Sequence, residues 1–241
     1  ADDVPGLRND STMVIHVSAD RSRVQIVSIP RDTLVDIPAC KHRDGTTSEP
    51  TTDAMFNNAM FYGADGGDEP EDIGPGIACV RSTAEKLSGM SIDAFMVVDF
   101  AGFINMIDSL GGVWFNIPHR IDDDSAQLYI DGGCWKLSGT HALAYMRSRK
   151  GQGDGSDISR IGRQQQLISA MLRELQDKNY VTDPGSLISF LQAAISSVNV
   201  SPNLSNASSD ASLLINVLQN IDRSNIQFVT MPVEELSWDP N

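Results

Sequence analysis

Hydrophobic positions follow two kinds of pattern along the chain, one typical of strands and one typical of helices. The alternation of the two patterns predicts an α/β fold. Short apolar runs bounded by turn residues indicate strands, whereas apolar residues spaced three and four apart indicate helices. The expected strands cover residues 12–18, 24–29, 94–98, 113–117 and 226–231. The expected helices cover residues 77–88, 100–110, 138–144 and 159–178. Strands that alternate with helices favour a mixed central β-sheet with α-helices on both faces.

Two stretches depart from this alternation. Residues 39–76 are rich in Gly, Asp, Thr and Pro, and the pattern predicts one short helix there, near residues 54–61. Long irregular segments inside a domain are often functional. Residues 196–212 are rich in Ser and Asn and are expected to form a surface connection. With 241 residues, 41% of them hydrophobic, the chain is expected to form one domain over residues 1–241.

Charge narrows the possible partners. The formal net charge is -14, and so acidic a surface repels nucleic acid and anionic membranes. No apolar run reaches the length of about 20 residues that spans a bilayer. Any site for an anion must therefore be local and built from clustered basic residues.

Such a cluster lies in residues 147–163, which hold five of the eighteen basic residues. Arg147 and Arg149 are two positions apart, so in an extended segment they point to the same side. Arg160 and Gln164 fall on the apolar arc of the next helix, at its N-terminus, where free N–H groups favour anions. Guanidinium groups match phosphate oxygens well. The alternative is a structural ion-pair network with Asp154 and Asp157.

A second candidate site lies at the ends of the β-hairpin that the strands at residues 12–18 and 24–29 are expected to form. Arg8 and Asp10 precede its first strand and Arg31 and Asp32 follow its second, so the four side chains are expected at one edge. A carboxylate beside arginines and phosphate suits Mg²⁺, which binds one or two carboxylates together with phosphate oxygens. An Asp–Arg salt bridge is the alternative.

The three cysteines leave the redox compartment open. Cys40, Cys79 and Cys134 form no Cys-x-x-Cys pair, which argues against a zinc or redox motif. Outside the cytoplasm they would give one disulfide and one free thiol, whereas in a reducing cytosol all three would be thiols.

Six segments together resemble the LytR-CpsA-Psr family of cell-wall glycopolymer phosphotransferases. The resemblance spans most of residues 8–178, and the last pair of motifs is the most specific. The matching segments are NDSTM (9–13), VSIPRDTLVDIP (27–38), FNNAMFYG (56–63), residues 92–118, and HALAYMRSR (141–149) with GSDISRIGRQQQ (155–166).

The resemblance implies an activity and a set of site residues. The expected reaction moves a glycopolymer from a polyprenyl-pyrophosphate lipid to a hydroxyl of peptidoglycan or a surface glycoprotein, with Mg²⁺ as cofactor and pyrophosphatase activity beside it. An apolar groove for the prenyl chain is expected near residues 95–107. The catalytic residues carried over are Arg31, Arg147, Arg149 and Asp157. The pyrophosphate ligands carried over are Arg8, Arg31, Arg147, Arg149, Arg160 and Gln164, and the metal ligand is Asp10.

The resemblance also implies surroundings for the site. It places the protein on the extracytoplasmic face of the cell membrane, pairs Cys40 with Cys79 in a disulfide, and leaves Cys134 without a partner. In the family, a first strand with a metal-binding Gly-x-Asp precedes the position of Arg8. This chain is expected to lack both that strand and the membrane anchor, so that metal binding would rest on Asp10 with water unless the strand lies outside this sequence. Met55 replaces a lysine that is frequent in the family, so one phosphate contact is missing. Two other functions remain open, namely hydrolysis of the lipid pyrophosphate and a non-catalytic binding or regulatory module of the envelope.

Overall fold

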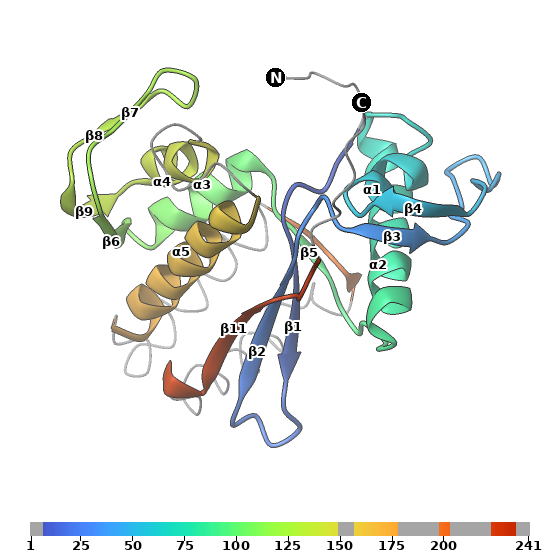
Figure 1. Cartoon of the computed structure of the whole chain (residues 1–241), viewed down its shortest axis with the longest axis horizontal. Coiled ribbons are helices and arrows are strands. Elements are labelled where there is room, and N and C mark those ends of the chain that lie inside the picture. The colour runs from blue at the N-terminus through green and yellow to red at the C-terminus, as the bar shows by residue number, and fades with distance from the viewer. Residues whose placement is uncertain (1–6, 149–156, 178–197, 203–222, 235–241) are drawn as a thin grey trace. The chain divides into compact units, whose positions relative to one another are not determined.

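The computed structural model describes residues 7–148, 157–177, 198–202 and 223–234. The helices are α1 (Asn58–Gly63), η1 (Pro70–Asp72), α2 (Ile73–Ser88), α3 (Phe100–Ser109), α4 (Gly139–Arg147), α5 (Asp157–Asp177) and η3 (Arg223–Asn225). The strands are β1 (Thr12–Val17), β2 (Val24–Ile29), β3 (Leu34–Ile37), β4 (Thr51–Met55), β5 (Met96–Val97), β6 (Val113–Ile117), β7 (Ile121–Asp123), β8 (Leu128–Ile130), β9 (Gly133–Leu137), β10 (Asn199–Val200) and β11 (Ile226–Thr230). Helices and sheets occur throughout, which confirms the mixed α/β class (Figure 1).

Contacts divide the chain into two compact units. Unit 1 comprises residues 1–15, 26–93 and 228–241, and unit 2 comprises residues 16–25 and 94–227. One three-stranded sheet has the order β1-β2-β11, and the division between the units falls inside each of its strands. The expectation of a single domain over residues 1–241 stays a prediction. Among the described helices, none combines the length and hydropathy needed to cross a membrane.

Unit 1 is built around a β-hairpin and two closely packed helices. β3 and β4 pair antiparallel, with Val35 opposite Ala54, and both side chains enter the core. Helices α1 and α2 approach so closely that a Cβ on Gly63 would lie 2.5 Å from the carbonyl oxygen of Pro75. A side chain at this position would force the helices apart. The core of this unit consists of Ile29, Val35, Ile37, Cys40, Ala54, Phe56, Ala59, Cys79 and Ala84.

A disulfide joins the hairpin segment of unit 1 to α2. Cys40 and Cys79 are bonded, with their Cα atoms 5.3 Å apart, and both residues are buried. Cys134 is a free, exposed cysteine. The pairing implied by the resemblance and the unpaired state of Cys134 are therefore both confirmed.

Unit 2 places two capped helices beside a second core. Asp99 caps α3 by accepting from the backbone N–H of Gly102, and Ser138 caps α4 by accepting from His141 N. A Cβ on Gly139 would clash with the backbone of Ile104, so α3 and α4 pack in close contact. β6 and β9 pair antiparallel over their full length. The core of this unit consists of Ile107, Leu110, Val113, Phe115, Ile117, Ile121, Leu128, Leu137, Ala142, Tyr145, Leu167 and Ala170.

Each strand and helix expected from periodicity is present as a strand or a helix near the expected residues. Two expectations are corrected, one for the short helix of residues 39–76 and one for Arg147. The short helix of residues 39–76 does not begin at residue 54, because Ala54 belongs to β4. The N–H groups of Phe56 and Asn57 then donate to the carbonyls of Thr33 and Arg31, so α1 begins only at Asn58.

The second correction concerns Arg147, which was expected in an extended segment beside Arg149. It is instead the last residue of α4, because the Ser148 N–H still donates to Ala144 O at 2.9 Å. Only one residue then separates the helix from Arg149, which lies outside the described residues. The prediction that Arg147 lies in an extended segment is therefore wrong.

Candidate functional site

In unit 1, Arg31 lies directly after β2 and is held by two carboxylates. Its Nη1 lies 2.8 Å from Asp10 Oδ1, and its Nε lies 3.4 Å from Asp32 Oδ1. The side chain of Arg31 is 25% exposed and that of Asp10 is 61% exposed. The expected meeting of hairpin ends is confirmed for Asp10, Arg31 and Asp32. It takes the form of the salt bridge that the sequence left open as the alternative to a metal site.

Arg8 is fixed by α1 of the same unit. Its guanidinium donates to Asn58 Oδ1 and lies over the ring of Phe61, 5.1 Å from the centroid. Both partners come from the FNNAMFYG motif. The ring attracts the cation while leaving part of the guanidinium open to another ligand. The structure thus links Arg8 to one of the motifs that carry the family resemblance.

In unit 2, Arg147 ends α4 and projects over α3. Its guanidinium carbon lies 5.1 Å from the ring centroid of Phe100, and both side chains are exposed. A cation at the last turn is favoured by the helix dipole. Asp157 is the first residue of α5. Arg149 lies outside the described residues, so its predicted role stays a prediction.

The first turns of α5 carry polar residues on the side that faces the core. Gln164 is 6% exposed and Arg163 is 9% exposed, whereas Arg160 is half-buried. The placement of Arg160 and Gln164 towards the apolar arc is thereby confirmed. Buried polar groups are retained only when they have partners.

Arg163 is a buried cation that the sequence reasoning counted only as part of the basic cluster. Its Nη2 donates to the Ser148 carbonyl at 3.2 Å. Burial lowers the pKa of its guanidinium, the nearby Tyr145 opposes this, and the charge of Arg160 adds to it. Burial likewise raises the pKa of Tyr145, against the attraction of Arg163. A signal for this residue existed, because Arg163, Leu167 and Ala170 follow helical spacing along one buried face.

The metal prediction rests on a single carboxylate. Within the described ranges, no group of three or more His, Cys, Asp or Glu residues could hold a metal ion. Asp10 is exposed enough to accept a hydrated cation, and one carboxylate is a sufficient protein contribution when phosphate oxygens supply other ligands. The residues present therefore fit Mg²⁺ bound jointly with a phosphorylated substrate.

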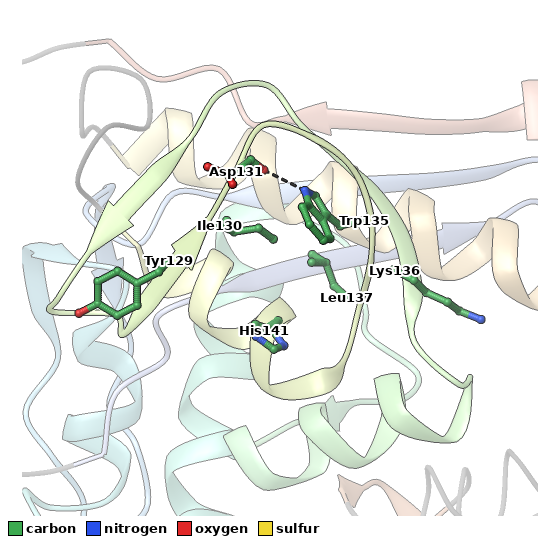
Figure 2. Close-up of a pocket in the computed structure, with 7 residues that line it drawn as sticks. All are labelled: Tyr129, Ile130, Asp131, Trp135, Lys136, Leu137 and His141. Carbon is green, nitrogen blue, oxygen red and sulfur yellow. Dashed lines mark hydrogen bonds between the residues drawn. The ribbon is translucent and has the colours of Figure 1, made fainter.

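A cavity of about 270 Å³ lies elsewhere in unit 2, between β8, β9 and α4 (Figure 2). Trp135 Nε1 donates to the Asp131 carbonyl at 2.9 Å, which fixes the indole, and Lys136 points away from it. None of the residues expected to bind pyrophosphate lines this cavity. Its lining consists of Tyr129, Ile130, Asp131, Trp135, Lys136, Leu137 and His141.

The candidate residues thus form two groups, each within one unit. The first group is Arg8, Asp10 and Arg31 in unit 1, and the second is Arg147, Arg160, Arg163 and Gln164 in unit 2. That both groups line one cleft stays a prediction. So does the prenyl groove near residues 95–107, where Ile107 is a core residue and Phe100 is 59% exposed.

The sequence of this chain is similar to those of named cell-wall proteins. It is 29% identical over 179 residues to the polyisoprenyl-teichoic acid–peptidoglycan teichoic acid transferase TagV of Bacillus subtilis, covering 72% of this chain and 40% of that protein. It is 27% identical over 237 residues to the cell wall biosynthesis protein LcpA of Corynebacterium glutamicum, covering 94% of this chain and 43% of that protein. The chain thus spans less than half the length of these two relatives.

Solved structures share the fold. The crystal structure of B. subtilis TagV superposes with a TM-score of 0.74 at 23% identity, covering 100% of this chain and 83% of that one. A LytR-Csp2A-Psr enzyme from Actinomyces oris superposes with a TM-score of 0.69 at 19% identity, covering 97% and 79%. At these identities the likeness establishes the fold alone.

The family assignment rests on nearly the whole chain. The model of the LytR_cpsA_psr family matches residues 4–240, which include both groups of candidate residues and the disulfide. The chain therefore belongs to the LytR_cpsA_psr family.

Proposed function

We propose that this chain is the catalytic domain of a transferase that moves a glycopolymer from a polyprenyl-pyrophosphate carrier to a hydroxyl of peptidoglycan. The observation that carries the proposal is the family match over residues 4–240, a range that contains Arg8, Arg31, Arg147, Arg149 and Arg160. The relatives' names support the same reaction, because one is a transferase that joins polyisoprenyl-linked teichoic acid to peptidoglycan. A hydroxyl of a surface glycoprotein is the second acceptor of the same chemistry.

In the proposed reaction, the acceptor oxygen attacks the phosphorus that bears the glycan. A new P–O bond forms a phosphodiester, the phosphoanhydride bond breaks, and polyprenyl monophosphate leaves with the electron pair. The acceptor proton passes to the leaving phosphate or to solvent. Negative charge collects on the leaving phosphate, so guanidinium groups fixed around it stabilise the transition state more than the ground state.

Each arginine has a distinct part in this proposal. Arg31, Arg147 and Arg149 hold the pyrophosphate oxygens and balance the developing charge, while Arg8, Arg160 and Gln164 orient the same group. Arg147 is suited to this part because it is exposed and rests on a ring rather than on a carboxylate in its described contact. Asp157 is the fourth residue proposed to be catalytic.

Magnesium is proposed as the cofactor, with Asp10 as its protein ligand. When bound, the cation would offset charge on the pyrophosphate oxygens. Asp10 would then turn from Arg31 towards the cation, which would remove one of the carboxylates that compete with phosphate for Arg31. If the Asp10–Arg31 pair stayed fixed, the two opposite charges would neutralise each other, and neither residue would bind its proposed ligand.

The proposed location is the extracytoplasmic face of the cell membrane, with an N-terminal anchor. Disulfides persist mainly outside the cytoplasm, and the buried Cys40–Cys79 bond fits that compartment. Cell-wall biosynthesis by a named relative supports an envelope location. The lipid-linked glycan and the acceptor are the proposed partners.

Two other functions use the same residues. Hydrolysis would place water where the acceptor hydroxyl belongs, giving pyrophosphatase activity, and a non-catalytic module would bind the lipid without turnover. The arrangement of Asp10 beside Arg31 favours catalysis over binding alone, because a carboxylate beside the arginine weakens the net attraction for an anion.

One assay separates the three functions. The protein is incubated with Mg²⁺ and a polyprenyl-pyrophosphate-linked oligosaccharide, with and without peptidoglycan, and products are followed by mass spectrometry. Transfer predicts glycan bound to peptidoglycan and released polyprenyl phosphate, with both abolished by Arg31→Ala. Product formed equally without acceptor would favour hydrolysis, and bound but unchanged lipid would favour the binding module.

A further inference from the structure

A buried carboxylate in unit 2 has a hydrogen-bond network that ends at the arginine motif. Asp123, at the end of β7, is 0% exposed. Its Oδ1 accepts from the N–H of Ser125 at 3.0 Å and of Ala126 at 3.3 Å, and from the Ser125 hydroxyl. Its Oδ2 accepts from the Ser148 hydroxyl at 2.8 Å. A buried carboxylate is tolerated only with such partners.

Ser148 is held from three directions. It is 0% exposed, its hydroxyl donates to Asp123, and its carbonyl accepts from Arg163 Nη2 at 3.2 Å. Its N–H donates to Ala144 O at 2.9 Å and closes the last turn of α4. In sequence it stands between Arg147 and Arg149, the two arginines proposed to hold the pyrophosphate.

We infer that Asp123, Ser148 and Arg163 form a positioning network that fixes the C-terminal end of α4, from which Arg147 projects. This inference rests on the proposed function and names three residues that act through that arginine. Asp123 accepts a hydrogen bond from the side chain of Ser148, and Arg163 donates one to its carbonyl. Rotation of the main chain at this point would therefore break a buried hydrogen bond. A guanidinium held in advance needs no reorganisation when the phosphate arrives.

The network joins three elements that are distant in sequence. β7 supplies Asp123, the end of α4 supplies Ser148, and α5 supplies Arg163. Arg163 donates from its buried guanidinium to the Ser148 carbonyl. This contact restrains the residue that directly follows Arg147 at the end of α4.

A purely structural role for the network is the alternative, and the chain offers a matched control. Ser125 and Ser148 both donate a hydroxyl to Asp123, one to each carboxylate oxygen, but only Ser148 belongs to the arginine segment. Ser125→Ala and Ser148→Ala therefore remove the same chemical group from the same acceptor. Asp123→Asn is the second test variant, should Ser148→Ala fail to fold.

The experiment measures binding of farnesyl pyrophosphate with Mg²⁺ by isothermal titration calorimetry, together with the melting temperature of each variant. Ser148→Ala and Asp123→Asn are expected to weaken binding about 10- to 100-fold, the cost of misplacing a binding group by roughly 1 Å. Ser125→Ala is expected to lower the melting temperature about as much as Ser148→Ala does, because both remove one hydroxyl donor to Asp123. Its binding of farnesyl pyrophosphate should stay within about twofold of wild type.

Wild-type affinity in folded Ser148→Ala or Asp123→Asn would overturn the inference alone. An equal loss in Ser125→Ala would also overturn it, because the effect would then follow stability rather than the arginine segment. Wild-type protein that fails to bind farnesyl pyrophosphate would overturn the proposed function, and the inference with it.

Discussion

Arg31 in unit 1 and Arg147 in unit 2 are held by different kinds of partner. In unit 1, Arg31 pairs with Asp10 at 2.8 Å, so its charge is already matched by a carboxylate. In unit 2, the named contacts of Arg147 and Arg163 are an aromatic ring and a backbone carbonyl, neither of which carries a charge. An anion that binds Arg31 must compete with Asp10, whereas one that binds Arg147 can approach while the ring contact stays in place.

The difference suggests separate tasks. Arg147 is suited to hold a pyrophosphate, because its described contact is an uncharged ring that an anion need not displace. The role proposed for Asp10, which would exchange Arg31 for Mg²⁺ when the substrate arrives, would couple phosphate binding to a cation in unit 1. This division gives four predictions.

The largest effect is expected from the disulfide, which unit 1 alone carries in the described structure. Cys40→Ser with Cys79→Ser should lower the free energy of unfolding by about 4 kcal/mol, because the unfolded chain loses a crosslink that closes a loop of this size. Urea denaturation measures the loss. Hydrogen exchange should show faster opening of α2 than of α4.

Cys134→Ser is the control for this change, since Cys134 is free and exposed. Its stability should match wild type. Equal acceleration of exchange in α2 and α4 would show that the two units open together, and the contrast between them would fail.

The next effect concerns Arg31 itself. Arg31→Ala should lower kcat of the transfer reaction about 100- to 1,000-fold, as expected when a donor to the developing charge is removed. Arg31→Lys should recover part of the loss, because a lysine keeps the charge without the guanidinium fork. Initial rates with the lipid-linked oligosaccharide provide the measurement.

Arg81→Ala is the matched control, because Arg81 is an arginine of unit 1 paired with Glu85 on the exposed side of α2. It should keep wild-type kcat. If Arg31→Ala keeps its rate, the proposed role of the first group is wrong.

A smaller effect tests the exchange proposed for Asp10. Without Mg²⁺, Asp10→Asn should bind farnesyl pyrophosphate up to about fivefold more tightly, because an exposed ion pair that competes for Arg31 is gone. Adding Mg²⁺ should then improve its affinity far less than it improves that of wild type. Calorimetry with Mg²⁺ and with chelator compares the two conditions.

Asp36→Asn controls for the loss of one surface carboxylate, since Asp36 pairs with Lys86 at 3.5 Å. It should respond to Mg²⁺ as wild type does. Full Mg²⁺ dependence in Asp10→Asn would remove Asp10 as the metal ligand.

The smallest effect is expected at the two aromatic rings under arginines. Phe100→Leu should weaken binding of farnesyl pyrophosphate about two- to fivefold, because an exposed cation–π contact is worth about 0.5–1 kcal/mol. Phe61→Leu, under Arg8 at the same 5.1 Å, should act similarly. Trp114→Leu removes an exposed aromatic residue of unit 2 and should leave affinity unchanged. A loss confined to one ring would show that only that arginine group binds the anion.

Local pattern predicted much of the fold. The strands at residues 113–117 and 24–29 and the helix from Phe100 appear where periodicity placed them, because each buries one face and ends at a turn signal. The β3–β4 hairpin was missed, since its strands are short and lie in a segment rich in Gly, Asp and Thr. The pairing of Cys40 with Cys79 followed from the family resemblance, because spacing alone does not choose a pair among three cysteines.

The sequence by itself determined the fold class, the family and the basic segment at residues 147–163, because periodicity and motif spacing are local properties of the chain. Only the tertiary structure decided that Arg147 ends a helix and that Asp10 pairs with Arg31. It also decided that Ser148 forms hydrogen bonds with Asp123 and Arg163. These contacts join β7, α4 and α5, or the two ends of a hairpin. Such pairings depend on how elements pack, and no periodicity within a single element encodes which partner a buried serine or carboxylate will meet.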